Sequence, residues 1–186
     1  MPEIIAIANQ KGGVGKTTTT VNLAAALHEI GKKTLLVDLD TQGNATTACG
    51  IDKNNIRATI YDLFLGETTI ENTMVHSEAN GFWVLPANKD LMAAEIQLLE
   101  FRDREFQLKQ ILTGIDSRFD YVLIDSPPSM NILTLNALAA SHGVIIPAQC
   151  EYYALEGLTG LLETINKIQE KINPELKIKG VLRTMF

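Results

Sequence analysis

The sequence is poor in cysteine and in positive charge, and it contains no long apolar run. Its two cysteines, Cys49 and Cys150, lie far apart without metal-ligand spacing, so we expect both thiols to be reduced and buried, as in a cytosolic protein. The formal net charge of −6 argues against a general binder of polyanions, although it leaves room for a local basic patch. No stretch approaches the roughly 20 apolar residues of a membrane span, and the N-terminus lacks the charged region of a signal peptide.

The composition is that of an ordinary folded protein, with 46% hydrophobic and 20% charged residues. We find no repeat, linker or low-complexity segment, so we expect one domain over residues 1–186. Strand and helix patterns alternate, which predicts an α/β fold with a doubly wound, mostly parallel sheet. The predicted strands are residues 4–8, 34–38, 82–86, 121–125, 144–147 and 178–186; the predicted helices are 17–30, 60–65, 90–99, 105–112, 132–140 and 155–172, and residues 41–55 read as turn-rich and polar.

A glycine-rich stretch joins the first predicted strand to the first predicted helix: Gln10-Lys11-Gly12-Gly13-Val14-Gly15-Lys16-Thr17-Thr18. Strand, glycine loop and helix in this order are typical of a phosphate-binding loop. Glycine lets backbone N–H groups approach phosphate oxygens, and the positive end of the following helix adds to the attraction. In such a loop Lys16 supplies a charge for the β- and γ-phosphates, and the Thr17 hydroxyl is placed to bind Mg²⁺.

The loop departs from the common pattern G-x-x-x-x-G-K-[ST]. Gln10 stands where the first glycine is expected, and a second lysine, Lys11, follows it. Two lysines are more positive charge than one triphosphate in one chain normally recruits. Lys11 therefore either serves a second nucleotide across a dimer or is a solvated lysine on a glycine turn.

Three acidic residues stand at the carboxyl ends of predicted strands, where open parallel sheets bind ligands. Asp125 ends an apolar run, as in a Walker B strand, and would hold Mg²⁺ through water; the alternative is a turn cap before Ser126. Asp38 and Asp40 point to opposite sides of an extended chain, so we expect them to have different roles. Asp40 either acts beside a γ-phosphate or is a solvated loop residue.

Four blocks of sequence, residues 9–19, 37–46, 124–129 and 147–157, carry a resemblance to a known family. The first contains K-G-G-V-G-K-T-T, which resembles the deviant Walker A loop K-G-G-x-G-K-[ST]-T of the ParA/MinD superfamily of P-loop ATPases. Together the blocks resemble the ParA/Soj partition branch. That branch usually has proline after the second aspartate, where this chain has Thr41, whereas the Gln42-Gly43-Asn44 that follows fits.

The resemblance implies a P-loop ATPase fold and a slow, Mg²⁺-dependent ATPase that binds ATP and ADP and acts in plasmid or chromosome partitioning. The ATP-bound homodimer would bind DNA non-specifically, and a ParB-like partner would stimulate the hydrolysis that resets it. We expect a cytoplasmic, nucleoid-associated protein and no membrane partner. Because the family usually continues well past residue 186, we expect the C-terminal portion, with most DNA- and adenine-contacting residues, to be missing from this chain.

The resemblance also assigns roles to individual residues. The predicted catalytic residues are Lys11, which reaches the nucleotide of the partner subunit, Lys16, and Asp40, which orients or activates the attacking water. The predicted metal set is Thr17, Asp38 and Asp125. The predicted nucleotide-binding residues are Lys11, Gly12, Gly13, Val14, Gly15, Lys16, Thr17 and Thr18. Residues 126–132 resemble the loop that senses the γ-phosphate, and residues 149–156 belong either to a dimer or partner surface or to ordinary packing.

Two other functions stay open at this point. A membrane-bound division regulator of the MinD type would need a C-terminal amphipathic helix, which this chain cannot show, and residues 40–44 favour partition. A nucleotide-gated scaffold without meaningful turnover would have no need of the water-orienting carboxylate predicted at Asp40. An iron–sulfur carrier of the same superfamily would need a Cys-x-x-Cys pair, which is absent from the sequence.

Overall fold

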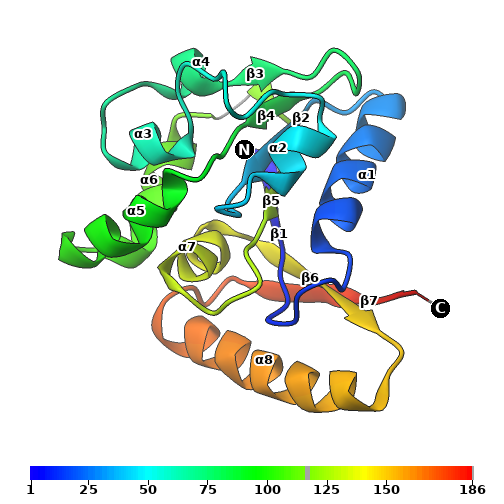
Figure 1. Ribbon diagram of the computed structural model, residues 1–186. Coiled ribbons are helices and arrows are strands. Elements are labelled where there is room, and N and C mark those ends of the chain that lie inside the picture. The colour runs from blue at the N-terminus through cyan, green and yellow to red at the C-terminus, as the bar shows by residue number, and fades with distance from the viewer. Residues whose placement is uncertain (116–117, 186) are drawn as a thin grey trace.

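The computed structural model describes residues 1–115 and 118–185, which form a seven-stranded sheet with helices on both faces (Figure 1). The strand order is β3-β4-β2-β5-β1-β6-β7. The strands are β1 (Glu3–Ile7), β2 (Thr34–Asp38), β3 (Val75–His76), β4 (Trp83–Leu85), β5 (Tyr121–Asp125), β6 (Gly143–Gln149) and β7 (Lys177–Thr184). All pairings are parallel except that of β3 with β4, which confirms the predicted α/β class.

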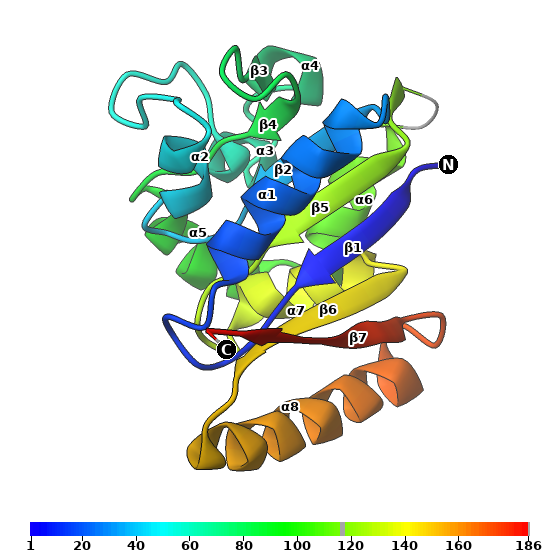
Figure 2. The same cartoon turned by 90° about the vertical axis from the view of Figure 1, so that its right-hand side faces the viewer.

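The helices divide between the two faces of the sheet (Figure 2). They are α1 (Lys16–Glu29), α2 (Asn44–Ala48), α3 (Ile60–Phe64), α4 (Ile70–Thr73), α5 (Leu91–Gln97), α6 (Gln107–Thr113), α7 (Ile132–Ala140) and α8 (Tyr152–Lys171), with short 3-10 turns η1 (Leu98–Glu100) and η2 (Arg104–Phe106). Successive residues of a strand face opposite sides, so β1 contributes to two cores. Ile5 and Ile7 pack with the α1 and α2 side, whereas Ile4 and Ala6 pack with the side that carries α3 and α5 to α8.

The topology brings the carboxyl ends of three central strands together. The chain leaves β1 through α1 toward β2, and it later leaves β5 through α7 toward β6, on the other side of β1 (Figure 2). In register, Asp125 pairs with Ile7 on one side and with Asp38 on the other. This reversal of winding direction is the position at which open α/β sheets bind ligands.

The predicted elements all occur, with boundaries that match at β2, β5 and α7 and lie within a few residues elsewhere. Residue 186, the predicted end of the last strand, lies outside the described residues. Three short elements were not predicted. α2 lies within the segment 41–55, and α4 and β3 follow α3. α2 has only five residues, which is too short for an apolar periodicity to appear in the sequence, and it begins after Gly43, which has φ 60°. β3 is a two-residue strand that is set only by its antiparallel pairing with β4.

Two expectations from the sequence concern the burial of the cysteines and the absence of a membrane-spanning segment. Both cysteines are free thiols, but only Cys49 is buried, so the expectation of burial is wrong for Cys150, which is exposed at the end of β6. No helix within the described residues is long and apolar enough to cross a membrane.

Candidate nucleotide-binding site

The loop between β1 and α1 turns through two glycines in the left-handed region. Gly13 has φ 72° and Gly15 has φ 91°, values that side chains with a Cβ disfavour. Gly15 is also the N-cap of α1, and among the described residues no side chain caps this end of the helix. The first N–H groups of α1 are therefore open to an anion, as a phosphate-binding loop requires.

A cavity of about 440 Å³ lies against this loop. Its lining brings together residues from four separate segments: Gly12, Gly13, Gly15, Lys16, Thr17 and Thr18 from the loop and α1, Asp40, Gln42 and Asn44 from the segment after β2, Pro128, and Met185. The volume lies in the range of small-molecule sites. Of the predicted nucleotide-binding residues, Lys11 and Val14 are not in this lining, and Val14 is buried with its carbonyl accepting from the Thr184 hydroxyl at 2.8 Å.

Lys16 is buried beneath the cavity, with 7% of the residue exposed. Its Nζ donates to the backbone carbonyl of Lys11 at 3.1 Å, so the ammonium is held across the loop. Burial lowers the pKa of Lys16, while the negative charges of Asp125 and Asp40 raise it. A buried ammonium that lines a cavity is well suited to bind a phosphate.

Asp125 accepts hydrogen bonds from two threonines of α1. The Thr17 hydroxyl donates to Oδ2 at 2.7 Å, and the Thr20 hydroxyl donates to Oδ1 at 3.1 Å. Burial, with a further contribution from the charge of Asp38, raises the pKa of Asp125 to about 7, against the two hydrogen bonds. The hydrogen bond therefore places the Asp125 carboxylate and the Thr17 hydroxyl side by side, and oxygen atoms are the ligand type that Mg²⁺ prefers.

Asp38 and Asp40 have different surroundings, as their alternation predicts. Asp38 is fully buried and accepts from Thr46 N at 2.8 Å, from the Thr46 hydroxyl at 2.7 Å and from Asp40 N at 3.0 Å. Burial raises the pKa of Asp38 to about 6, against these hydrogen bonds. Asp40 instead lines the cavity, and its carboxylate accepts from Gln42 N at 3.0 Å and Asn44 Nδ2 at 3.3 Å.

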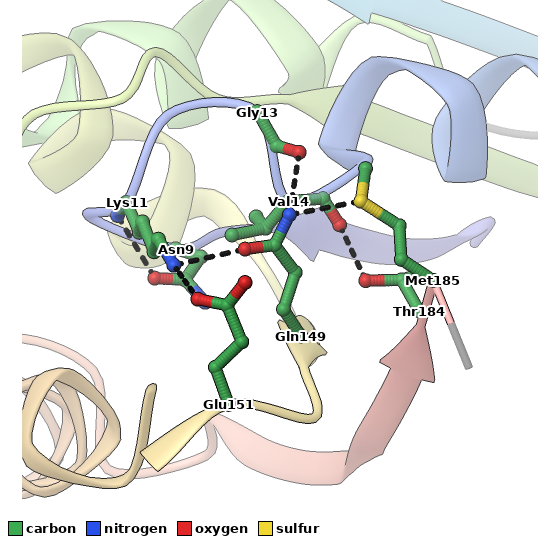
Figure 3. Close-up of polar contacts among 8 residues, drawn as sticks. All are labelled: Asn9, Lys11, Gly13, Val14, Gln149, Glu151, Thr184 and Met185. Carbon is green, nitrogen blue, oxygen red and sulfur yellow. Dashed lines mark hydrogen bonds and ion pairs between the residues drawn. The ribbon is translucent and has the colours of Figure 1, made fainter. Parts of the chain in front are cut away.

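Lys11 extends away from the cavity toward the end of β6 (Figure 3). Its Nζ donates to Gln149 Oε1 at 2.8 Å and forms an ion pair with Glu151 Oε2 at 2.9 Å. The two lysines of the loop therefore point in different directions, and only Lys16 faces the cavity of its own chain.

Comparison with known proteins identifies the family. A family model described as an AAA domain matches residues 2–178. The chain is 50% identical over 183 residues to the chromosome partitioning protein ParA of Myxococcus xanthus, covering 98% of this chain and 65% of that protein. It is 49% identical over 186 residues to the sporulation initiation inhibitor protein Soj of Bacillus subtilis, covering 100% of this chain and 74% of that protein. The chain belongs to the ParA/Soj family of ATPases.

A solved structure supports the same fold for this ParA/Soj family member. Cobyrinic acid a,c-diamide synthase from Mycobacterium smegmatis, with bound ADP and magnesium, matches with a TM-score of 0.96 and 45% identity, over 100% of this chain and 76% of that one. The predicted P-loop ATPase fold is therefore confirmed.

Several residues around the ParA/Soj site were not predicted from sequence. Thr20 lies one helical turn beyond Thr17 in a run of four threonines, so its place beside Asp125 was readable from the 3.6-residue period. Thr46 and Met185 offered no such signal, because tertiary folding alone brings them to Asp38 and to the cavity. The side chains of residues 152–156 lie outside the described residues, and with them the interpretation of Tyr152 and Tyr153 as dimer or partner contacts.

Proposed function

We propose that this chain is an ATP-driven partition switch: it binds ATP and ADP with Mg²⁺, dimerises with ATP, and is reset by hydrolysis during plasmid or chromosome segregation. The observation that carries the proposal is one cavity at the carboxyl edge of the sheet, where a glycine loop, a buried lysine and the Asp40 carboxylate meet. We propose residues 1–186 as one ATPase domain.

The residues of the loop fit a nucleotide. In this proposal the backbone of residues 11–18 cradles the phosphates, with Lys16 as the charge that neutralises them. No group of three or more His, Cys, Asp or Glu side chains in the described part of the chain is able to hold a metal ion. Mg²⁺ is usually held by one or two carboxylates together with substrate phosphates, so the Thr17 hydroxyl and the Asp125 carboxylate suffice as the protein's direct share. Asp38 is proposed to act indirectly, because it is fully buried and its oxygens already accept three hydrogen bonds. When bound, the ion neutralises charge on the phosphate oxygens.

Asp40 is the proposed residue that orients the attacking water. Its carboxylate lines the cavity, and its loop is fixed by hydrogen bonds from Gln42 N and Asn44 Nδ2. A carboxylate beside a γ-phosphate can accept a hydrogen bond from water and align it for in-line attack. Asp38 is not placed for this role, because it is fully buried and does not line the cavity.

Lys11 is proposed to act on the nucleotide of a partner subunit. Its ammonium is absent from the cavity of its own chain, as expected of a lysine that serves a second nucleotide. A two-fold dimer places the same lysine twice, once toward each nucleotide, and the added positive charge would stabilise phosphoryl transfer. ATP would then bridge the two subunits.

The cellular part of the proposal rests on the family. The relative that matches at 50% identity is a chromosome partitioning protein, so we propose non-specific DNA as the ligand of the ATP-bound dimer and a ParB-like protein as the partner that stimulates hydrolysis. We propose a cytoplasmic, nucleoid-associated location. Co-sedimentation with DNA and with liposomes, each with ATP and with ADP, separates this function from a membrane-bound regulator of the MinD type.

The deciding experiment is the solution mass of Asp40→Ala, measured by light scattering with Mg²⁺ and either ATP or ADP. We expect a dimer with ATP and a monomer with ADP, because the variant binds nucleotide but does not hydrolyse the ATP that holds the dimer together. Lys11→Ala in the same background should keep ATP affinity and lose the dimer. A monomer with both nucleotides would contradict the switch and favour an ATPase that acts within one chain.

A further inference from the structure

Lys11 is held in its own chain by two residues on either side of Cys150, where β6 ends and α8 begins. Gln149 Oε1 lies 2.8 Å and Glu151 Oε2 lies 2.9 Å from the Lys11 ammonium (Figure 3). The side chains of Lys11 and Glu151 are 42% and 59% exposed, so the pair is accessible from outside the chain.

The backbone of Lys11 is fixed independently of its side chain. Its N–H donates to Asn9 Oδ1 at 3.0 Å, while Asn9 Nδ2 donates to the carbonyl of Pro147 at 2.6 Å. Its carbonyl accepts from Lys16 Nζ at 3.1 Å. The ammonium of Lys11 can therefore turn without breaking the hydrogen bond between its backbone N–H and Asn9.

Gln149 connects this contact to the phosphate-binding loop. Its Nε2 donates to the carbonyl of Gly13 at 3.3 Å and lies 2.9 Å from Met185 Sδ (Figure 3). With its amide nitrogen engaged by the loop, its oxygen is turned toward Lys11. The ammonium thus receives one neutral and one charged oxygen, both outside the cavity.

We propose that Glu151, with Gln149, is a positioning residue that keeps the Lys11 ammonium directed away from any nucleotide. The phosphates of a nucleotide bound to a second copy of the chain then replace Glu151 as the partner of Lys11. The inference rests on the proposed function, in which Lys11 serves the nucleotide of the partner subunit. Lys11 cannot pair fully with Glu151 and with a triphosphate at once, so the carboxylate competes with dimer formation. An exposed ion pair is weak, and its loss should tighten the ATP-dependent dimer by roughly two- to fivefold.

The first test measures the in-chain contact without nucleotide. The natural protein is treated with N-hydroxysuccinimidyl acetate, and the acetylation rate of each lysine is followed by mass spectrometry. In Glu151→Gln the Lys11 amine should react several-fold faster, while Lys33, at the opposite edge of the sheet, serves as the internal reference. Glu29→Gln removes the same charge at the far end of α1 and should leave Lys11 unchanged. An unchanged Lys11 rate in Glu151→Gln would overturn the proposal.

The second test measures the dimer dissociation constant with Mg²⁺ and ATP in the Asp40→Ala background. Glu151→Gln should tighten the dimer two- to fivefold relative to Glu29→Gln. Equal constants for the two variants would overturn the competing role of Glu151, even with faster acetylation. If Asp40→Ala itself stays monomeric with ATP, the proposed switch fails, and the acetylation result still reports the contact by itself.

Discussion

The Thr17 hydroxyl donates to Asp125 Oδ2 over 2.7 Å, across 108 positions of sequence. The contact joins the start of the helix after the glycine loop to the end of β5, so the two oxygen atoms proposed for the metal already lie side by side in the chain. Thr20, on the next turn of α1, holds the other carboxylate oxygen at 3.1 Å. The side of the site proposed for Mg²⁺ is thus fixed by side chains of one helix and one strand.

Replacing Thr17 should impair catalysis with Mg²⁺ more than nucleotide binding. Thr17→Ala removes a proposed ligand and leaves Asp125 with Thr20 alone, so the rate of ATP hydrolysis should fall at least about tenfold, the effect of roughly 1.4 kcal/mol. Steady-state hydrolysis over a range of Mg²⁺ concentrations measures this. Thr17→Ser keeps the hydroxyl and should retain most of the rate; if both variants lose activity equally, the hydroxyl is not the reason.

Lys16 should dominate nucleotide affinity. Lys16→Ala removes a buried cation from the cavity, and hydrogen bonds to charged groups are worth about 1.5–3 kcal/mol, so ATP affinity should fall by about 100-fold. Isothermal titration with ATP measures the change, and the melting temperature checks that the variant folds. Lys33→Ala removes the same charge just before β2, at the opposite edge of the sheet, and should bind ATP normally. Retained affinity in Lys16→Ala would refute the phosphate cradle.

The buried carboxylates should make the metal-free protein less stable as pH rises. Burial raises the pKa of Asp125 to about 7 and that of Asp38 to about 6, so both protonate more readily in the folded chain than in the unfolded one. Their contribution to the free energy of unfolding is fully present below pH of about 4 and is lost as pH rises through 6 to 7. At about 1.4 kcal/mol per pKa unit, the part of this loss that falls between pH 5 and pH 7.5 amounts to a few kcal/mol.

Urea denaturation at pH 5 and pH 7.5, without nucleotide or Mg²⁺, measures this loss. Asp125→Asn cannot ionise and should show a clearly smaller difference between the two pH values than the natural protein. Glu67→Gln, an exposed carboxyl between α3 and α4, should leave the difference unchanged. If the free energy of unfolding of Asp125→Asn differs between pH 5 and pH 7.5 by as much as that of the natural protein, other groups control the pH dependence of stability.

The sequence was sufficient to place the central residues of the site but not their partners. Strand and helix alternation predicts that Lys16, Asp40 and Asp125 meet, because parallel strands end at one edge of the sheet. The contact of Lys11 with Glu151 depends on how β6 ends beside the loop, and no local pattern encodes that. The exposed thiol of Cys150 was missed for the same reason, since residue type alone favours burial.

Helix α2 gives a second example of what local sequence does not reveal. Its five residues lack an apolar stripe, and the segment reads as a polar turn. What holds it is Thr46, whose hydroxyl donates to Asp38 at 2.7 Å and accepts from Ala87 N at 2.9 Å. Because Thr46 stands in a polar run of sequence, its buried position between the ends of two strands could not be predicted from the sequence.

Thr46 should therefore contribute more to stability than its neighbour Thr47. Thr46→Val keeps the shape but leaves the buried Asp38 carboxylate with one partner fewer and Ala87 N without its acceptor. An unsatisfied buried Ala87 N–H costs about 1–3 kcal/mol, and the lost hydrogen bond to the Asp38 carboxylate adds a similar amount, so the free energy of unfolding should fall by roughly 2–6 kcal/mol.

Thr47→Val is the matched control, because Thr47 is exposed and its hydroxyl donates to the carbonyl of Gly43, the N-cap residue of α2, at 3.0 Å. Its cost should stay within about 0.5 kcal/mol, which is typical of a surface position. Urea denaturation of both variants gives the comparison. Asp38 also accepts from Asp40 N, so greater mobility of the Asp38 side chain should displace the loop that carries Asp40. Thr46→Val should therefore lower the rate of ATP hydrolysis at temperatures where the protein is fully folded. Equal costs for the two threonines would mean that α2 is held by its apolar contacts, with no special contribution from the Asp38–Thr46 hydrogen bond.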